Sequence, residues 1–338
     1  MSTIAAYCTH TGGGGGYGGG EMYTFAILSI LNRYYDLTVF TNLDYPAFEQ
    51  AHQYGLKLDN LNWRALPSQF NWRKYDIQIN LAHTMMLPAQ ARRSILFVLF
   101  PQFPDWNTSA YDTVVGISDF TNTWIKRYWG RDAELLTPAV PVEEFKVLPK
   151  KKSIVSVGRF FEVPGGNNKN HIWMIRCFKK FAEQAGDWEL HLVGSVQHKD
   201  YFEKVKKEAD WRVHFHHDLD RDEYIQLMGE ASYYWHAAGY GADKPSGKEH
   251  WGIVAVEAMA AGAIPIVHNS GGIQETGALT WDDPQQLVDI TLDLVHNSER
   301  TEVVQQLMLE KSRDFSLQCM EKPLLEIIEK PVLIPPHV

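Results

Sequence analysis

Two glutamates, Glu249 and Glu257, stand eight residues apart in the segment GKEHWGIVAVEAMAAGAIPIVHNSGGIQE, residues 247–275. The small and apolar residues after Gly252 predict a short helix over about 253–261. A helix that opens just after a strand presents free N–H groups and the positive end of its dipole. Such an end is suited to bind a phosphate group.

Glu257 is unusual within this helix because apolar residues surround it in the sequence, namely Ala255, Val256, Ala258 and Met259. A carboxylate in such surroundings is costly to bury unless another group bonds to it. Ribose hydroxyls would serve, and so would a buried lysine or histidine in a purely structural pair. The segment by itself leaves both interpretations open.

The same segment resembles the signature of GT4, a large family of retaining glycosyltransferases with the GT-B fold. Around the two glutamates, WG, EAMAAG, a proline and NSGG stand in the register of that signature. The resemblance implies that Glu249 contacts hydroxyls of the donor sugar and that Glu257 contacts the nucleotide ribose. It also implies that the segment around the start of the helix holds the donor diphosphate, through Trp251, Gly252, Ile253 and Val254.

Two cations extend the resemblance. SVGRF (156–160) followed by KNH (169–171) resembles the family's Arg and Lys element, with FEVPGGNN widening the usual gap between them. The resemblance implies that Arg159 and Lys169 neutralise the leaving diphosphate, so that no metal ion or other cofactor is required. Taken singly, each is also explained as a surface cation.

Further segments cover most of the chain. LHLVGS (190–195) is similar to a family strand whose turn, at Gly194, lies near the nucleotide, and 116–145 is similar to the end of the N-terminal domain. The resemblance is to the lipid-linked-oligosaccharide mannosyltransferases in particular. It implies GDP-mannose as donor ahead of a UDP-sugar, and a glycan or lipid-linked acceptor.

The glycine-rich stretch THTGGGGGYGGGEM, residues 9–22, follows the first predicted strand. Gly19, Gly20 and Glu21 match a shorter Gly-Gly-Glu turn of the family, which implies a close approach of the backbone to the donor. The preceding glycines, 12–16, exceed that need, and we expect them to form a mobile flap.

Many family members carry a histidine in the N-terminal domain that reaches the donor sugar. At the matching place, FPQFPD, this chain has Gln102. His83 follows an earlier predicted strand and is the candidate replacement. A lone histidine is more often structural, and this alternative stays open.

Two other functions compete with sugar transfer. Gly14, Gly16 and Gly19 fit the dinucleotide fingerprint of an NAD-dependent oxidoreductase, but the acidic residue expected at the end of the second strand is absent. A non-catalytic nucleotide-sugar-binding module on the same fold is the other alternative. The intact Glu249, Glu257 and Arg159 argue against it.

Other polar clusters have ordinary explanations. In DLD (218–220) the aspartates are interpreted as helix caps rather than a metal site. His214, His216 and His217 suggest a metal, but only the first two share a strand face and no third ligand is evident. KRYW (126–129) could touch a membrane or a polyanionic acceptor, or be a solvated helix face.

The elements that position these residues alternate between strands and helices, which predicts parallel sheets with both faces covered. The fold expected is therefore α/β, GT-B, with two Rossmann-like doubly wound domains facing across a cleft. We predict an acceptor-side domain over 1–148, a nucleotide-sugar domain over 149–310 and a helical segment, 311–338, packing back toward the first.

The predicted strands are 3–7, 37–42, 75–82, 94–100, 112–118, 153–160, 188–195, 212–219, 232–238 and 263–269. The predicted helices are 22–35, 119–130 with Asp119 as N-cap, 171–186 and the long stretch 301–330.

Composition limits the remaining classes. The 338 residues carry a net charge of −9 without a basic stripe, so we expect no nucleic-acid partner. The three cysteines have no short spacing, and neither a signal peptide nor an 18-residue apolar run is present. We expect a cytoplasmic protein with a possible peripheral contact to a membrane.

Overall fold

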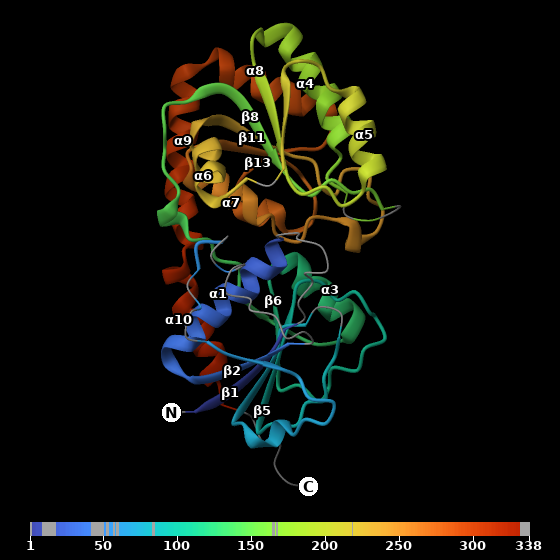
Figure 1. Cartoon of the computed structure of the whole chain (residues 1–338), viewed down its shortest axis with the longest axis vertical. Helices are drawn as coiled ribbons and strands as arrows, with labels where there is room; N and C mark the ends of the chain where they lie inside the picture. The colour runs from blue at the N-terminus through green and yellow to red at the C-terminus, as the bar shows by residue number, and fades with distance from the viewer. Residues whose placement is uncertain are drawn as a thin grey trace. The chain divides into compact units, whose positions relative to one another are not determined.

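The computed structural model describes residues 2–8, 18–41, 51, 54–56, 58, 61–82, 85–163, 166, 168–217 and 219–331. The chain divides into two compact units, coloured by residue number in Figure 1. Unit 1 comprises Met1–Gly13, Gly20–Ala139 and Leu317–Val338, and unit 2 comprises Gly14–Gly19 and Val140–Ser316. The N-terminal part of unit 1 thus ends at Ala139, before the predicted boundary at residue 148, and unit 2 ends at Ser316, after the predicted boundary at residue 310.

In its described part, unit 1 contains a seven-stranded parallel sheet with the order β3-β2-β1-β4-β5-β6-β7. The strand order reverses between β1 and β4, which is the doubly wound arrangement. The strands are β1 Thr3–Tyr7, β2 Asp36–Thr41, β3 Asn62–Ala65, β4 Ile77–Asn80, β5 Arg93–Val98, β6 Thr113–Gly116 and β7 Glu134–Leu135.

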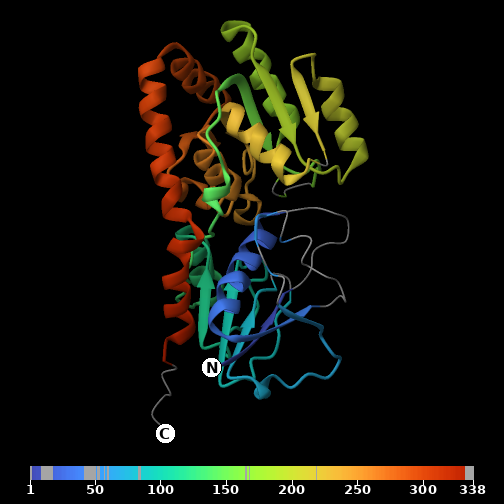
Figure 2. The ribbon, with the colours of Figure 1, turned by 60° about the vertical axis from the view of Figure 1, so that its left-hand side comes forward.

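The helices of unit 1 come from both ends of the chain: α1 Gly19–Tyr34, η1 Trp72–Lys74, α3 Asp119–Trp129 and α10 Leu317–Glu329. Arg33 of α1 lies 2.6 Å from a carboxylate oxygen of Glu321, so α10 lies beside α1 (Figure 2). Leu324 and Ile328 of α10 are buried. This packing makes α10 part of the first unit although it ends the chain.

In unit 2 the described residues form a six-stranded parallel sheet with the order β10-β9-β8-β11-β12-β13. Here the order reverses between β8 and β11. The strands are β8 Lys151–Val157, β9 Glu189–Val193, β10 Val213–His216, β11 Ala231–His236, β12 Ile264–His268 and β13 Leu279–Trp281.

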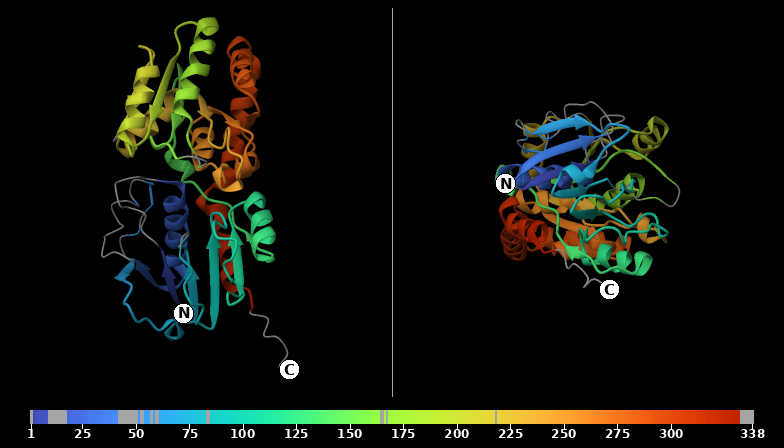
Figure 3. Two further views of the ribbon diagram at one scale, coloured as in Figure 1. Left: turned by 90° about the vertical axis from the view of Figure 1, so that its right-hand side faces the viewer. Right: turned by 90° about the horizontal axis from the view of Figure 1, so that it is seen from below.

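Helices cover both faces of this sheet (Figure 3). One face shares an apolar core with α4, α5 and α8, and includes Leu190, Leu192 and Trp235. Helices α6, α7 and α9 contact the strands from the other side. The elements are α4 His171–Ala185, α5 Lys199–Glu208, α6 Arg221–Glu230, α7 Ile253–Ala260, α8 Pro284–His296 and α9 Ser298–Ser312, with the 3₁₀ turns η2 Val142–Glu144, η3 Pro245–Gly247, η4 Gly271–Thr276 and η5 Arg313–Phe315.

The predicted α/β fold with two doubly wound sheets is confirmed, with two differences in detail. The N-cap of α3 is Ser118, whose side chain accepts from Thr121 N–H, and not Asp119, which lies in the first turn. The stretch 301–330 is not one helix, because η5 and Ser316 separate α9 from α10. Asp220 caps α6 in a capping box, as interpreted, whereas Asp218 lies outside the described residues.

Candidate active site

The loops that leave β8 and β11 carry most of the predicted site residues. These two strands are neighbours at the point where the strand order of unit 2 reverses. Ligands of doubly wound sheets bind beyond the carboxyl ends of the strands at such a point. Arg159 and Lys169 follow β8, and Glu249 follows β11.

Glu249 is the centre of this site. Lys169 Nζ lies 3.0 Å from Glu249 Oε2, and the two side chains are 21% and 14% exposed, respectively. The stem of Lys169 passes close to Gly158, where an added Cβ would lie 2.6 Å from Lys169 Cγ. A glycine at the end of β8 therefore makes room for the lysine that reaches Glu249.

All three residues of the KNH segment position the site. Besides the contact of Lys169, Asn170 Nδ2 donates to Ala237 O at 2.8 Å and ties this loop to the end of β11. His171 Nε2 lies 3.2 Å from Gly158 O and connects α4 to the turn after β8. Burial lowers the pKa of His171 to about 3, so its ring is neutral and the Nε2–H form donates to this carbonyl.

A histidine that was not predicted completes the surroundings of Glu249. His236 Nε2 lies 3.0 Å from Glu249 Oε2, and Tyr234 OH lies 2.8 Å from His236 Nδ1. Burial lowers the pKa of His236 despite the nearby carboxylate. In the neutral ring, Tyr234 donates to Nδ1 and the Nε2–H donates to Glu249. These two hydrogen bonds, from Tyr234 to His236 and from His236 to Glu249, orient the Glu249 carboxylate from the end of β11.

The charge state of Glu249 follows from these contacts. Burial would raise its pKa, but the charge of Lys169 and the hydrogen bond from His236 bring the pKa well below the ordinary value. Glu249 is therefore an ionised acceptor, and both contacts are made to Oε2. Such a carboxylate can accept hydrogen bonds from sugar hydroxyls.

The glycines of NSGG hold the backbone of Glu249. A Cβ on Gly271, which has φ +70°, would lie 2.2 Å from Glu249 O. Gly272 N–H donates to the same carbonyl oxygen at 2.8 Å. The close approach explains why glycine stands here, because any side chain at Gly271 would displace the loop that carries Glu249.

Helix α7 begins directly after this loop. Its N-cap is Gly252 with φ +88°, and among the described residues no side chain caps this end. A Cβ on Gly252 would lie 2.6 Å from Ile273 Cδ1. Ile253 and Val254 form the first turn, and the buried ring of Trp251 packs edge-on against Phe315. The N–H groups of the first turn are therefore not bonded by a side-chain cap and can donate to a bound anion.

Arg159 and Gly194 lie together at the ends of β8 and β9. A Cβ on Gly194 would lie 2.2 Å from Gly158 O and 3.1 Å from Arg159 N, so the two turns touch through their backbones. The Arg159 guanidinium lies 5.6 Å from the ring centroid of Phe161. The side chain of Arg159 is half-buried.

Glu257 has partners within the protein. Tyr224 OH donates to Glu257 Oε2 at 2.5 Å, and Arg221 Nη1 lies 3.8 Å from Oε1. Arg221 also bonds Glu144 Oε2 at 3.0 Å. Burial raises the pKa of Glu257, with the charge of Arg221 opposing the shift. The alternative expected from the sequence was a structural pair of Glu257 with a buried lysine or histidine. The partners are instead Arg221 and Tyr224 of α6.

The predicted site residues of the N-terminal part of the chain are only partly described. Gly19 and Gly20 are the first two residues of α1, after β1. Gln102 is exposed. His83 and the glycines 12–16 lie outside the described residues. Whether His83 or Gln102 takes the place of the family's histidine stays a prediction.

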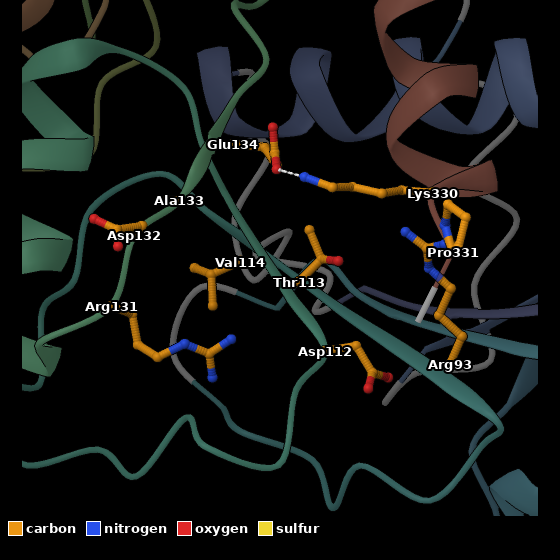
Figure 4. A pocket seen from close by; sticks show the side chains of 10 residues that line it. All are labelled: Arg93, Asp112, Thr113, Val114, Arg131, Asp132, Ala133, Glu134, Lys330 and Pro331. Carbon is orange, nitrogen blue, oxygen red and sulfur yellow. Dashed lines mark hydrogen bonds and ion pairs between the residues drawn. The ribbon is translucent and has the colours of Figure 1, made fainter. Parts of the chain in front are cut away.

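Unit 1 also contains a cavity of about 330 Å³, shown in Figure 4. It lies at the amino ends of β5, β6 and β7, away from the edge where ligands of such sheets bind. Its cations are already engaged: Lys330 pairs with Glu134, Arg131 donates to Thr108 O and Tyr111 O, and Arg93 donates to Ile327 O. It is therefore not a candidate for the donor site.

Comparison with known proteins gives a family match for part of the chain and a fold match for nearly all of it. Residues 142–280 match the family model of glycosyl transferases group 1. Over its whole length the fold is similar to HepE of Anabaena, solved with UDP and glucose, at 14% identity and a TM-score of 0.73, covering 98% of this chain and 100% of HepE. It is also similar to WaaG, a glycosyltransferase involved in lipopolysaccharide biosynthesis, at 13% identity and a TM-score of 0.67, covering 97% and 100%.

These findings show a GT-B fold, in which residues 142–280 are similar to the group 1 glycosyl transferases. Within that class it is similar to the GDP-Man:Man(3)GlcNAc(2)-PP-Dol alpha-1,2-mannosyltransferases. The human protein is 32% identical over 186 residues, 48% of this chain and 35% of the relative. The Xenopus laevis protein is 28% identical over 198 residues, 53% and 38%. The matched part thus spans little more than a third of these relatives. No helix in the described ranges has the length and apolarity to cross a membrane.

Proposed function

We propose that this chain is a retaining, metal-independent hexosyltransferase that moves a sugar from a nucleotide diphosphate to a glycan or lipid-linked acceptor. The observation that carries the proposal is the arrangement of Lys169, His236 and Glu249 beside the open end of α7. GDP-mannose is the favoured donor, because the similar mannosyltransferases are named for it. A UDP-sugar is the second candidate, because HepE was solved with UDP.

The proposed donor pose follows from charge. The diphosphate lies at the start of α7, where N–H groups and the helix dipole favour an anion. Arg159 and Lys169 stabilise the charge that develops on the leaving group. Glu249 accepts hydrogen bonds from hydroxyls of the sugar, and Glu257 accepts from the ribose when it exchanges its bond to Tyr224.

Retention of configuration is proposed from the family resemblance. We propose a front-face substitution, in which the acceptor oxygen attacks from the side of the departing diphosphate. The acceptor's proton then passes to a leaving phosphate oxygen. This step needs no carboxylate nucleophile from the protein.

For the acceptor side we propose a peripheral membrane contact through α3. The centroids of its Trp124 and Tyr128 rings are 5.1 Å apart, and the Arg127 guanidinium lies 4.8 Å from the centroid of the Trp124 ring. Lys126 and Arg127 are exposed on the same helix. Aromatic rings with neighbouring cations are typical of surfaces that touch anionic lipid.

A nucleotide panel tests the function. We expect GDP to raise the melting temperature more than UDP, ADP or NADH, and GDP-mannose to be hydrolysed slowly. Glu249→Gln should bind GDP but lose hydrolysis, whereas Glu183→Gln, an exposed glutamate of α4, should keep both. Binding of GDP without turnover of any sugar nucleotide would instead support the non-catalytic module. Product analysis by NMR then reports the anomeric configuration, and inversion would contradict the retaining mechanism.

A further inference from the structure

We propose that unit 2 binds a divalent transition-metal ion of the zinc class through Glu189, His191 and His214, at the edge of its sheet. The ligand set comes from two adjacent strands and shares no residue with the proposed donor site. Its three protein ligands leave the fourth tetrahedral position to water, and the site takes no part in sugar transfer.

The register of the strands brings the three side chains together. β9 and β10 are parallel neighbours with His191 opposite His214, and β10 is the edge strand of the described sheet. Glu189 lies two residues before His191 and therefore on the same face. The sequence showed His214 and His216 without a third ligand, because the missing ligands stand more than twenty residues earlier in the chain.

The distances suit a metal. Glu189 Oε1 lies 3.4 Å from His214 Nε2, and Glu189 Oε2 lies 3.5 Å from His191 Nε2. The three ligand atoms all lie within 4.8 Å of one another. Tetrahedral zinc with bonds of about 2.0–2.2 Å separates its ligand atoms by about 3.3–3.6 Å. Each imidazole already lies at that separation from one of the two carboxylate oxygens, so the two imidazoles have to approach each other and one shared oxygen.

The hydrogen bonds of the histidines are compatible with metal ligation through Nε2 of His191 and of His214. His214 Nε2 is buried and has no hydrogen-bond partner among the described residues, although its side chain is 40% exposed. His191 Nδ1 lies 2.9 Å from His216 Nε2. If His191 donates through Nδ1, its Nε2 lone pair faces Glu189. A partner on the far nitrogen of a ligating histidine is the usual outer shell of a zinc site.

The chemistry of the three ligand groups agrees with this assignment. Imidazole ligates a metal in its neutral form. Two neutral imidazoles and one carboxylate form an N₂O set that suits zinc and its neighbours better than calcium or magnesium.

An ion here would join the edge strand to its neighbour. The carbonyl of His216, at the end of β10, accepts from Gly194 N–H at 2.9 Å. Gly194 lies at the turn after β9 beside Arg159. Binding of the ion should therefore stabilise unit 2 without being required for the chemistry of transfer.

The test is zinc titration of the full chain after removal of metals with a chelator. We expect isothermal calorimetry to show one saturable ion per chain, and cobalt(II) to give the visible absorption of a tetrahedral nitrogen–oxygen site. His214→Ala and Glu189→Gln should each weaken binding at least about 10-fold, and His216→Ala about 10-fold or more through the loss of the outer bond. Both ligand variants should fold, because Glu189 and His214 are 48% and 40% exposed.

His296→Ala is the matched control, since His296 is an exposed histidine at the end of α8. It should bind zinc as tightly as the unchanged protein. The proposal is overturned if the full chain shows no saturable binding, or if Glu189→Gln and His214→Ala bind as tightly as the control. Unchanged GDP affinity in both ligand variants would keep this result separate from the proposed transferase function.

Discussion

At the scale of single residues, Glu249 combines the contributions of three separate segments. Lys169 supplies charge from the loop after β8, His236 supplies a hydrogen bond from the end of β11, and Gly272 holds its backbone. Each contact alone is ordinary. Together they fix an ionised carboxylate within a largely buried site, where electrostatic interactions are stronger than in water.

Lys169→Met should separate the catalytic from the structural role of this pair. We expect donor hydrolysis to fall about 10²–10³-fold, because a fixed cation at the leaving group is lost. Removing the partner of a mostly buried carboxylate should also cost about 1–3 kcal/mol of stability, less than for a fully buried pair because Lys169 is 21% exposed. Steady-state kinetics and denaturant unfolding measure the two effects.

The double variant Lys169→Met/Glu249→Gln should recover stability without recovering activity. Lys152→Met is the control, since Lys152 pairs with Asp187 on the surface, with 60% and 78% of the side chains exposed. Activity retained in Lys169→Met would show that Arg159 alone carries the charge of the leaving group.

His171 predicts a dependence of stability on pH. Burial lowers its pKa to about 3 in the folded protein, against the ordinary 6.5. The contribution of the neutral His171 to the free energy of unfolding is fully present above pH 6.5 and is lost as the pH falls toward 3. In this range the imidazole binds a proton in the unfolded chain but not in the folded protein. Between pH 6 and 4, His171→Gln should flatten the slope of unfolding free energy by up to about 1.4 kcal/mol per pH unit. An unchanged slope in urea unfolding would contradict this.

At this scale the sequence predicted the site in part. Lys169 and Glu249 were predicted separately, and the structure joins them. His236 was missed because SYYWHAA reads as a buried strand, although its last polar residue stands at a strand's carboxyl end. Arg221 and Tyr224 were missed because α6 is only weakly patterned, and nothing local ties them to Glu257.

At the scale of elements, the start of α7 depends on Gly252. Its φ of +88° is unfavourable for other residues, and a Cβ would lie 2.6 Å from Ile273. We expect Gly252→Ala to weaken GDP binding about 10-fold or more, because the N–H groups of the first turn must shift. Calorimetric titration of GDP measures the loss.

Gly277→Ala is the matched control for this prediction. Gly277 also has a positive φ, +81°, but its Cβ would meet only the Lys311 side chain, at 3.5 Å or more. It should lose comparable stability from backbone strain while binding GDP normally. Equal losses of GDP affinity in both variants would assign the effect to strain and not to the position of α7.

Most elements were predictable because their patterns are local. The buried strands of a parallel sheet read as apolar runs, and TIAAY corresponds to β1. The break between α9 and α10 was not predictable in this way. Ser316 is extended and bridges Val140, which lies far away in the sequence. The long-range pairing of β9 with β10 hid the cluster around His191 for the same reason.

At the scale of the whole molecule, the chain passes between its units twice after α1, at 139/140 and at 316/317. The two passages lie side by side within unit 2, because Val140 N–H donates to Phe315 O at 2.8 Å and Val140 bridges Ser316. The last helix can therefore complete the first unit while α9 remains in the second.

Deletion of residues 317–338 should destabilise unit 1 selectively. Met320, Leu324 and Ile328 are buried, and at about 1.5–3 kcal/mol for each side chain their loss should cost several kcal/mol. The bond from Arg93 to Ile327 O would also be lost, leaving a buried cation without this acceptor. We expect rapid proteolysis within unit 1, while GDP still stabilises unit 2.

Deletion of 332–338 alone is the control for this experiment, because it leaves every described contact of α10 in place. It should keep both the protease resistance and the melting temperature of the full chain. Equal sensitivity of the two deletions would show that α10 does not stabilise unit 1. Loss of GDP binding only in the longer deletion would show that the donor site of unit 2 needs an intact first unit, and would make the two units one cooperative system.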